Sequence, residues 1–237
     1  MKYAASLLLI MLSIQSDAQN LAPADILQNV FLISTDTGTA TSFVVEHSGR
    51  EYLITARHAF KKKNVHNSTV DFKIYHIDKW MKLNGKILLD EDTSIDIAVI
   101  TLNERLQVIK PLETGKNTSY FVGQECYFFG FPYGKFFTSF GKNIYPFVKH
   151  AMISAITDKI VFLDGINNVG FSGGPVVIKD PYDNKLKICC VITAYYPEYN
   201  SIENRKGPKI DSLRYYSNSG IIFSYSTSYI DSILNRN

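Results

Sequence analysis

The sequence has few of the residues that mark specialised classes of protein. Its 237 residues include only 3 cysteines, 8 prolines and 14 glycines, which excludes a disulfide scaffold and a collagen-like chain. Charge of one sign is also scarce, because a net charge of +3 is too small to make nucleic acid the expected partner. With 46% hydrophobic residues, the chain does not fall in the disordered class either. We therefore expect a globular protein of one or two domains.

Long hydrophobic runs are missing apart from one near the start. Lys2 precedes an apolar stretch over residues 4–14, which is far shorter than the roughly 20 residues that a membrane-spanning helix needs. Small residues, Ser16 and Ala18, follow it, and this pattern predicts a secretory signal peptide over residues 1–18 that is cleaved near Ala18. The alternative is a buried N-terminal helix. We expect an exported protein, periplasmic or extracellular, without a membrane span.

The cysteine count is odd, so at least one thiol is free or pairs between molecules. Cys189 and Cys190 are adjacent in an apolar run, where a strand would point them to opposite faces. At most one of them can therefore pair with Cys126, and three buried thiols are the alternative. Neither a Cys-x-x-Cys spacing nor a His/Cys pair at ligand distance occurs, so a structural zinc is not expected. We expect no other metal or cofactor.

What the chain does contain is aromatic residues, with 15 phenylalanines and 15 tyrosines, and short strand-like runs separated by turns. This pattern predicts an all-β protein in two similar halves, divided by a polar stretch over residues 103–124. The runs are Val30–Ser34, Ser42–Glu46, Glu51–Thr55, Val70–His76, Lys86–Leu89 and Ile97–Leu102, then Cys126–Gly130, Val148–Ile156, Ile160–Asp164, Pro175–Ile178, Leu186–Thr193 and Gly220–Tyr225.

Local signals refine this pattern at three places. Residues 47–50 (His-Ser-Gly-Arg) predict a hairpin turn, and Asn84-Gly85 is a strong turn dipeptide. Residues 226–234 carry apolar side chains at helical spacing and predict a short C-terminal helix.

One segment, Gly170-Phe171-Ser172-Gly173-Gly174-Pro175, precedes an apolar strand. Glycines beside a serine permit a tight backbone that presents the hydroxyl, while the N–H groups of Gly170 and Ser172 point at a common spot. Taken alone, the segment is also compatible with an ordinary glycine-rich turn.

Two further residues change that balance. His58 ends a strand in Thr55-Ala-Arg-His-Ala, and Asp96 opens a strongly apolar strand, where its carboxylate is expected to be buried and hydrogen-bonded. Alone, each is more often structural or solvated. Together with Ser172 they supply a nucleophile, a base and a carboxylate that holds the base in the right tautomer, in the order His, Asp, Ser.

At these motifs the sequence resembles the trypsin/chymotrypsin-like serine peptidases, over roughly residues 30 to 235. Residues 126–134 (Cys-Tyr-Phe-Phe-Gly-Phe-Pro-Tyr-Gly), 192–194 and 220–225 are similar to the bacterial HtrA-like branch. The resemblance implies two six-stranded antiparallel β-barrels with the active site in the cleft between them. It implies an N-terminal barrel over residues 19–115 that carries His58 and Asp96, and a C-terminal barrel over residues 116–237 that carries Ser172.

The resemblance also implies roles for residues. His58, Asp96 and Ser172 form a catalytic triad, the N–H groups of Gly170 and Ser172 form an oxyanion hole, and the specificity pocket is lined by Ile166, Thr193, Ala194 and Tyr195. Because the pocket position Ile166 is not an acid, we expect cleavage after small or medium apolar residues.

Two departures from the family are visible. Phe171 stands where the animal enzymes carry an aspartate that pairs with a newly cut N-terminus, so activation by N-terminal insertion is not expected. The chain ends soon after the predicted helix, so no PDZ domain is expected.

Residues 195–219 form an unusually long connection without an obvious pattern. This connection either narrows substrate choice or gates the cleft, or it is a tolerated surface insertion.

These observations leave two functional hypotheses. The first is a serine endopeptidase that acts on proteins or peptides through an acyl-enzyme. The second is a catalytically silent barrel pair that binds proteins through the same cleft, a hypothesis that the unusual Phe171 keeps open.

Overall fold

The computed structural model describes residues 24–61, 66–76, 78–106, 108, 111–112, 114, 120–135, 137–138, 144–203 and 209–237. The signal peptide predicted over residues 1–18 lies outside this part of the chain. None of the helices in the described ranges has the length and apolarity needed to cross a bilayer.

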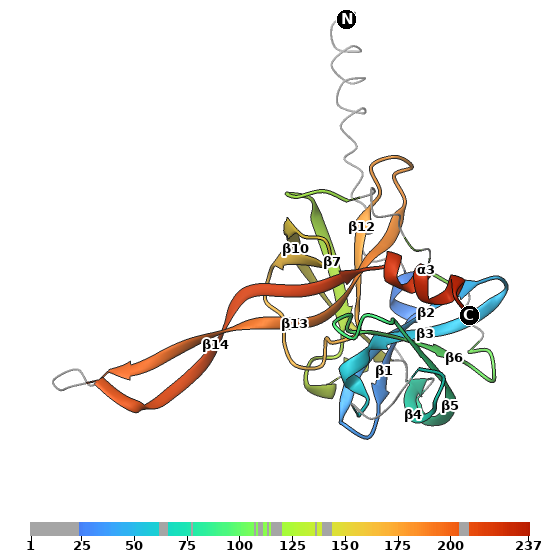
Figure 1. Ribbon diagram of the computed structural model, residues 1–237, viewed down its shortest axis with the longest axis horizontal. Coiled ribbons are helices and arrows are strands. Elements are labelled where there is room, and N and C mark those ends of the chain that lie inside the picture. The colour runs from blue at the N-terminus through green and yellow to red at the C-terminus, as the bar shows by residue number, and fades with distance from the viewer. Residues whose placement is uncertain are drawn as a thin grey trace, which may run out of the picture.

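Two closed six-stranded antiparallel barrels make up the structure, which confirms the predicted fold class (Figure 1). The first barrel has the strand order β1-β2-β3-β6-β5-β4 and follows a short helix, α2 (Ala24–Gln28). Its strands are β1 (Val30–Ser34), β2 (Thr39–His47), β3 (Arg50–Ala56), β4 (Thr69–His76), β5 (Lys79–Leu89) and β6 (Ile97–Thr101).

The second barrel has the strand order β10-β11-β14-β13-β12-β7 and is followed by helix α3 (Ser228–Asn235), the predicted C-terminal helix. Its strands are β7 (Glu125–Gly130), β10 (Phe147–Ile156), β11 (Ile160–Asp164), β12 (Pro175–Lys179), β13 (Leu186–Glu203) and β14 (Lys209–Ser226). A separate two-stranded sheet joins β8 (Phe137–Thr138) to β9 (Ile144–Tyr145).

Each of the twelve strand-like runs of the sequence lies on a strand of a barrel, and the turn at residues 47–50 is confirmed. There Ser48 and Gly49 both have positive φ angles, 51° and 75°, as a two-residue type I′ turn requires. The turn predicted at Asn84-Gly85 was wrong. These residues lie inside β5, where a Cβ on Gly85 would come within 1.9 Å of the Thr101 carbonyl oxygen. The glycine therefore serves a close approach between β5 and β6, and the hairpin turns at Asp78 instead, with a φ of 64°.

The three cysteines are free and buried in the core of the second barrel, so the expected alternative of a disulfide is excluded. Cys189 and Cys190 do not point to opposite faces, as the strand pattern predicted, because both belong to that core. A bulge explains the difference: Val176 pairs with Cys190 and Val177 with Ile188, so Cys189 is the extra residue and the alternation is broken.

Residues 195–219, expected to lack regular structure, are largely the continuation of β13 and β14. The two strands pair from the barrel outward as far as Glu203 and Lys209 and leave the body of the molecule as a long ribbon, the β13–β14 arm (Figure 1). The sequence pattern missed it because residues 195–200 and 215–220 are exposed or only partly buried, so no face of buried apolar residues marks the strands there.

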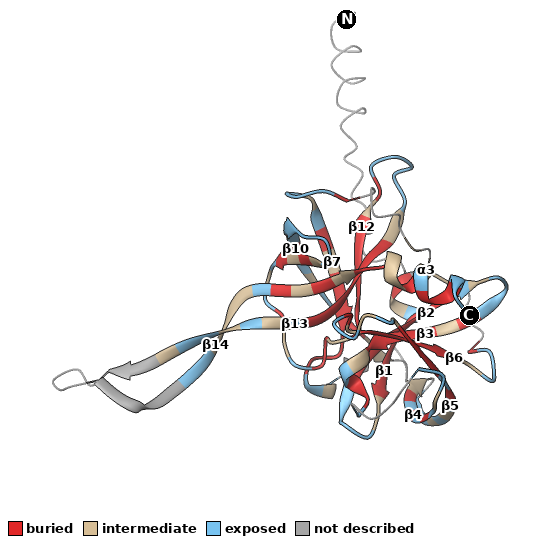
Figure 2. Cartoon of the chain, viewed as in Figure 1, coloured by how far each residue is buried: buried red, intermediate tan, exposed pale blue. Residues whose placement is uncertain are grey.

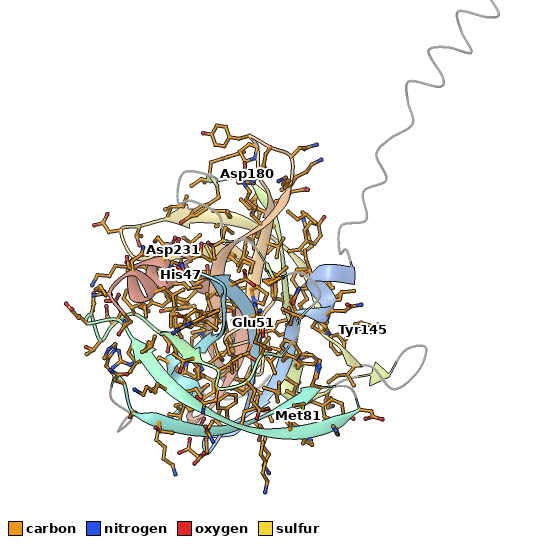
Figure 3. The ribbon with its side chains drawn as sticks, turned by 90° about the vertical axis from the view of Figure 1, so that its right-hand side faces the viewer. His47, Glu51, Met81, Tyr145, Asp180 and Asp231 are labelled. Carbon is orange, nitrogen blue, oxygen red and sulfur yellow. The ribbon has the colours of Figure 1, made fainter. Side chains whose placement is uncertain are left out.

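A core shared by the two barrels holds them together, in addition to a core inside each one (Figure 2). Phe43 of β2 and Phe129 of β7 both belong to this shared core and are fully buried. Helix α3 adds Ile230, Ile233 and Leu234 to it. Figure 3 shows α3 at the edge of the first barrel, where Asp231 lies beside His47 of β2. The barrels are therefore rigidly apposed, and residues at their junction are held from both sides.

Candidate active site

His58 lies in a one-turn 3-10 helix, η1 (Arg57–Ala59), that starts where β3 ends. β3 pairs with β6 so that Ala56 is opposite Ile97, the residue after Asp96. This register brings the carboxylate to the histidine: Asp96 Oδ1 accepts the His58 N–H at 2.9 Å, and Oδ2 lies 2.6 Å from His58 Nδ1. The predicted pair is thus formed by strand pairing inside the first barrel.

The contact with Asp96 determines which ring nitrogen of His58 carries the proton. A carboxylate at Nδ1 favours the tautomer that carries its proton there, which leaves Nε2 as an acceptor. The hydrogen bond to Asp96 raises the pKa of His58 above its ordinary value, with burial opposing and the negative charge of Asp96 assisting. Asp96 is hydrogen-bonded as expected but only partly buried, since its side chain retains 27% exposure.

Ser172 reaches the same place from the second barrel. The Thr41 N–H of β2 donates to the Ser172 carbonyl at 2.9 Å. The next residue, Gly173, has a φ of 85°, and a Cβ there would lie 2.1 Å from the Thr41 carbonyl oxygen and 2.8 Å from the Ala56 nitrogen. Glycine is thus required where the loop packs against the end of β3, two residues before His58.

The Ser172 hydroxyl bonds to a backbone carbonyl rather than to the imidazole of His58. Ser172 Oγ donates to the Thr193 carbonyl at 2.9 Å, and among the described residues no hydrogen bond joins it to His58. Such contacts are often loose in a free enzyme and tighten when substrate binds.

The turn before Ser172 has a defined peptide orientation. The Phe171 N–H donates to the Asn168 carbonyl at 3.2 Å, and Gly170 has a φ of 103°, as in a type II turn. The Val169 carbonyl accepts the Tyr133 N–H at 2.7 Å, so the Gly170 N–H of the same trans peptide points the opposite way. Within the described part of the chain, the N–H groups of Gly170 and Ser172 have no hydrogen-bond partner.

The side chain of Phe171 packs this turn onto the core of the second barrel. Its ring is fully buried and meets Phe128 edge-on at 5.2 Å between centroids. Lys149 Nζ lies 5.3 Å from the Phe171 centroid and donates to Asn168 Oδ1 at 2.6 Å and to the Ile166 carbonyl at 2.8 Å. Burial lowers the pKa of Lys149. The Phe171 ring is thus held by an apolar contact and lies beside a lysine.

Thr41 joins the two halves of the site and was not singled out by sequence reasoning. Its hydroxyl donates to the Gly170 carbonyl at 2.6 Å and accepts the Phe131 N–H at 3.0 Å, while its own carbonyl accepts the Thr55 hydroxyl at 2.7 Å. No local motif marks such a residue, because all of its partners except Thr55 are distant in sequence. Tyr133 belongs to the motif over residues 126–134, but the sequence does not predict the hydrogen bond from its N–H to the Val169 carbonyl.

The predicted pocket residues surround Ser172 unevenly. Thr193 is buried and touches the serine hydroxyl, Tyr195 is partly buried, and Ala194 is exposed. Ile166 is 60% exposed, and its carbonyl is held by Lys149.

A comparison with models of protein families gives the family of the chain. The model of the trypsin-like peptidase domain matches residues 40–182, which is more than half of the chain and includes all three candidate catalytic residues. The chain belongs to the trypsin-like peptidase family. No curated protein matched the sequence.

Two solved structures of one protease share the fold. The inactive form of the Rv3671c protease superposes with a TM-score of 0.56 at 15% sequence identity, covering 94% of this chain and 95% of the other. A serine-to-alanine variant of Rv3671c from M. tuberculosis H37Rv, also inactive, gives the same TM-score and identity, with 93% of that chain covered. At this identity the likeness shows the fold alone.

Proposed function

We propose that the chain is a serine endopeptidase in which His58, Asp96 and Ser172 form the catalytic triad. The observation that carries this proposal is the His58–Asp96 pair, with its Nδ1 to Oδ2 distance of 2.6 Å, facing a serine loop whose Gly170 and Ser172 N–H groups are free. Membership of a trypsin-like peptidase family supports hydrolysis of peptide bonds. The leader-like pattern of residues 1–18 supports action in the periplasm or outside the cell.

In the proposed mechanism, Ser172 Oγ attacks the scissile carbonyl carbon while its proton passes to His58 Nε2. Asp96 stabilises the resulting imidazolium, and the Gly170 and Ser172 N–H groups stabilise the oxyanion. When the C–N bond breaks, His58 gives the proton to the leaving amine and an acyl-enzyme remains. Water then attacks the ester with His58 as the base, which releases the acid and restores Ser172.

A binding module without catalysis is the competing function. It would be favoured by a turn whose central peptide had flipped, so that a carbonyl occupied the place of the Gly170 N–H. The bond from Tyr133 to the Val169 carbonyl supports the opposite orientation, because it holds that carbonyl away.

Labelling with a fluorophosphonate probe tests the proposal directly. We expect the protein to be modified at Ser172 alone, as identified by mass spectrometry, and the Ser172→Ala variant to take up no probe. Uptake by neither protein between about pH 6 and pH 9, a range over which the histidine loses its proton, would leave the binding module as the better function.

A further inference from the structure

The loop that ends at Asp96 lies where the two barrels meet. Residues 90–96 join β5 to β6 of the first barrel, and Asp96 is the last residue before β6 begins. Ile95 and Ile97, on either side of it, are fully buried in the core that the two barrels share. Because Asp96 itself lies outside the strand, the direction of its side chain depends on the backbone just before it. Groups that hold this backbone therefore help to aim the carboxylate at His58.

A tyrosine of the second barrel bonds to this backbone. The Tyr225 hydroxyl donates to the Ser94 carbonyl, two residues before Asp96, at 2.7 Å. Tyr225 lies near the end of β14, just before α3, on a stretch that pairs with both β11 and β13 (Figure 1). Its ring packs against the shared core and meets Tyr229 edge-on at 6.2 Å between centroids. The second barrel thus presents the hydroxyl to the loop from a firmly held strand.

The same hydroxyl lies within electrostatic range of the carboxylate. Burial raises the pKa of Tyr225 above its ordinary value, and the negative charge of Asp96 is the next cause of the rise. A raised pKa keeps the phenol protonated over the pH range in which a histidine titrates. Tyr225 therefore remains a hydrogen-bond donor in both protonation states of His58.

Charged side chains from the C-terminal half of the chain also contact the loop. The ion pairs are Lys159 with Asp92, and Arg236 with both Asp90 and Glu91. The pair nearest to Asp96 in sequence is Lys159–Asp92, and its side chains are 51% and 40% exposed, so it contributes little. Lys159 also donates to the Ser94 hydroxyl at 3.2 Å, which again fixes a side chain. Only Tyr225, among the described contacts from the second barrel, fixes the backbone next to Asp96.

We propose that Tyr225 is a positioning residue, whose hydroxyl holds the Ser94 backbone so that Asp96 faces His58. In this role Tyr225 touches no reacting atom and acts through Asp96. The inference rests on the proposed function, in which Asp96 orients the histidine. It adds a group outside the triad, contributed by the barrel that carries the serine.

The two barrels then position the two parts of the site for each other. The first barrel holds the loop of Ser172 through Thr41, and the second barrel holds the loop of Asp96 through Tyr225. Each contact crosses the junction in the opposite direction. The geometry of the complete site therefore depends on the docking of the barrels, beyond the fold of either one.

The test removes a single hydroxyl. Tyr225→Phe keeps the ring in the shared core, and Tyr229→Phe is the matched control, because the neighbouring hydroxyl bonds to the Asp158 carbonyl instead. The first readout is the midpoint of the His58 ring titration by NMR, assigned by comparison with His58→Gln. It measures the His58–Asp96 pair without catalysis. The second readout is the rate of fluorophosphonate labelling.

We expect a His58 midpoint above 6.5 in the wild-type protein and in Tyr229→Phe, because the hydrogen bond to Asp96 raises the pKa of His58. Tyr225→Phe should lower this midpoint, since a less firmly held carboxylate bonds more weakly to Nδ1. The labelling rate of Tyr225→Phe should fall by about three- to tenfold, the worth of one hydrogen bond. Tyr229→Phe should keep the wild-type rate.

Combination with Asp96→Asn separates positioning from a general structural role. If Tyr225 acts through Asp96, adding Tyr225→Phe to Asp96→Asn leaves the His58 midpoint where Asp96→Asn has placed it. A loosening of the barrels would instead shift the midpoint equally in both backgrounds. Urea denaturation verifies that every variant is folded under the conditions of the titration.

Three results would overturn the inference. The first is a His58 midpoint in Tyr225→Phe equal to that of the wild type, and the second is an equal shift in Tyr229→Phe. The third is an equal shift with and without Asp96→Asn. Absence of labelling in the wild-type protein would refute the proposed function alone, because the titration reports on the His58–Asp96 pair whether or not Ser172 reacts.

Discussion

At the scale of single residues, Thr41 connects the first barrel to the loop that carries Ser172. It is fully buried, and through its hydroxyl and its N–H it holds the carbonyls of Gly170 and Ser172 from the opposite barrel. Two carbonyls fixed on either side of Phe171 leave the loop little freedom. A residue of the first barrel thus sets the backbone of the proposed nucleophile in the second.

Replacing this threonine tests that connection. Thr41→Val removes the hydroxyl and leaves the Gly170 carbonyl and the Phe131 N–H unpaired, so we expect a loss of about 1–3 kcal/mol in the free energy of unfolding. Slower fluorophosphonate labelling should accompany it. Urea denaturation and labelling rates measure both effects. Thr41→Ser keeps the hydroxyl and should retain most of the labelling rate, and equal rates for both variants would count against this role.

The His58–Asp96 pair predicts a pH dependence. His58 must be neutral to accept the Ser172 proton, so the labelling rate should rise with pH through a midpoint above 6.5, because the hydrogen bond to Asp96 raises the pKa of His58. Asp96→Asn removes that bond, which should lower the midpoint and reduce the rate by about 10⁴-fold. Asp92→Asn is the matched control, since that carboxylate contacts Lys159 and Ser94 instead. An identical midpoint in wild type and Asp96→Asn would contradict the assignment.

The surroundings of the predicted specificity pocket favour apolar substrates. Ile166 supplies no carboxylate. The Lys149 ammonium, which donates to the Ile166 carbonyl and to Asn168 Oδ1, places a positive charge nearby. Both features disfavour a substrate Lys or Arg, whose unpaired burial costs several kcal/mol. A peptide-library profile should therefore show cleavage after small or medium apolar residues, whereas a profile dominated by Lys or Arg would show that another acid reaches the pocket.

At the scale of elements, helix α3 links the second barrel to the first and so acts as a brace between them. It packs on β5 and β6 of the first barrel although it follows the last strand of the second. Burial raises the pKa of its Asp231 above the ordinary value, while the hydrogen bond from Thr114 and, to a smaller extent, the electrostatic effect of His47 lower it.

Shortening one side chain of this brace should destabilise the whole protein. Ile230→Ala removes a fully buried side chain from the shared core, and we expect a loss of about 2–5 kcal/mol in the free energy of unfolding. Ser232→Ala, on the exposed side of the same helix, should change it by less than about 0.5 kcal/mol. Urea denaturation compares the two, and similar small losses would show that α3 is dispensable.

The elements also show what sequence reasoning reaches. Barrel strands were predictable because a half-buried strand alternates apolar and polar residues, as β4 does, or is apolar throughout, as β6 is. The triad candidates could be singled out because His58 and Asp96 lie next to such strands, while Ser172 lies among glycines shortly before β12. Asn84-Gly85, the bulge at Cys189 and the β13–β14 arm were not, since a close backbone approach, a broken register and a ribbon without a core leave no such pattern.

At the scale of the whole molecule, the shared core predicts one unfolding transition. The only tryptophan, Trp80, packs edge-on against Tyr75 in the first barrel, while every cysteine is in the second. Burial raises the pKa of the Cys126 thiol to about 12, so it reacts with thiol reagents only on unfolding. Tryptophan fluorescence and thiol reactivity in increasing urea should therefore give the same midpoint. Two separated midpoints would mean that the barrels unfold independently.

The phenyl ring under the serine turn has a thermodynamic consequence. An ion pair at that place would weaken with added salt and would disappear when its carboxylate is protonated, whereas the contact of Phe171 with Phe128 carries no charge. Its strength follows the heat capacity of apolar hydration, which makes it weaker in the cold and stronger in sulfate. The packing of this ring against the core of the second barrel should therefore respond to temperature and to salts that strengthen apolar burial, and should be insensitive to pH.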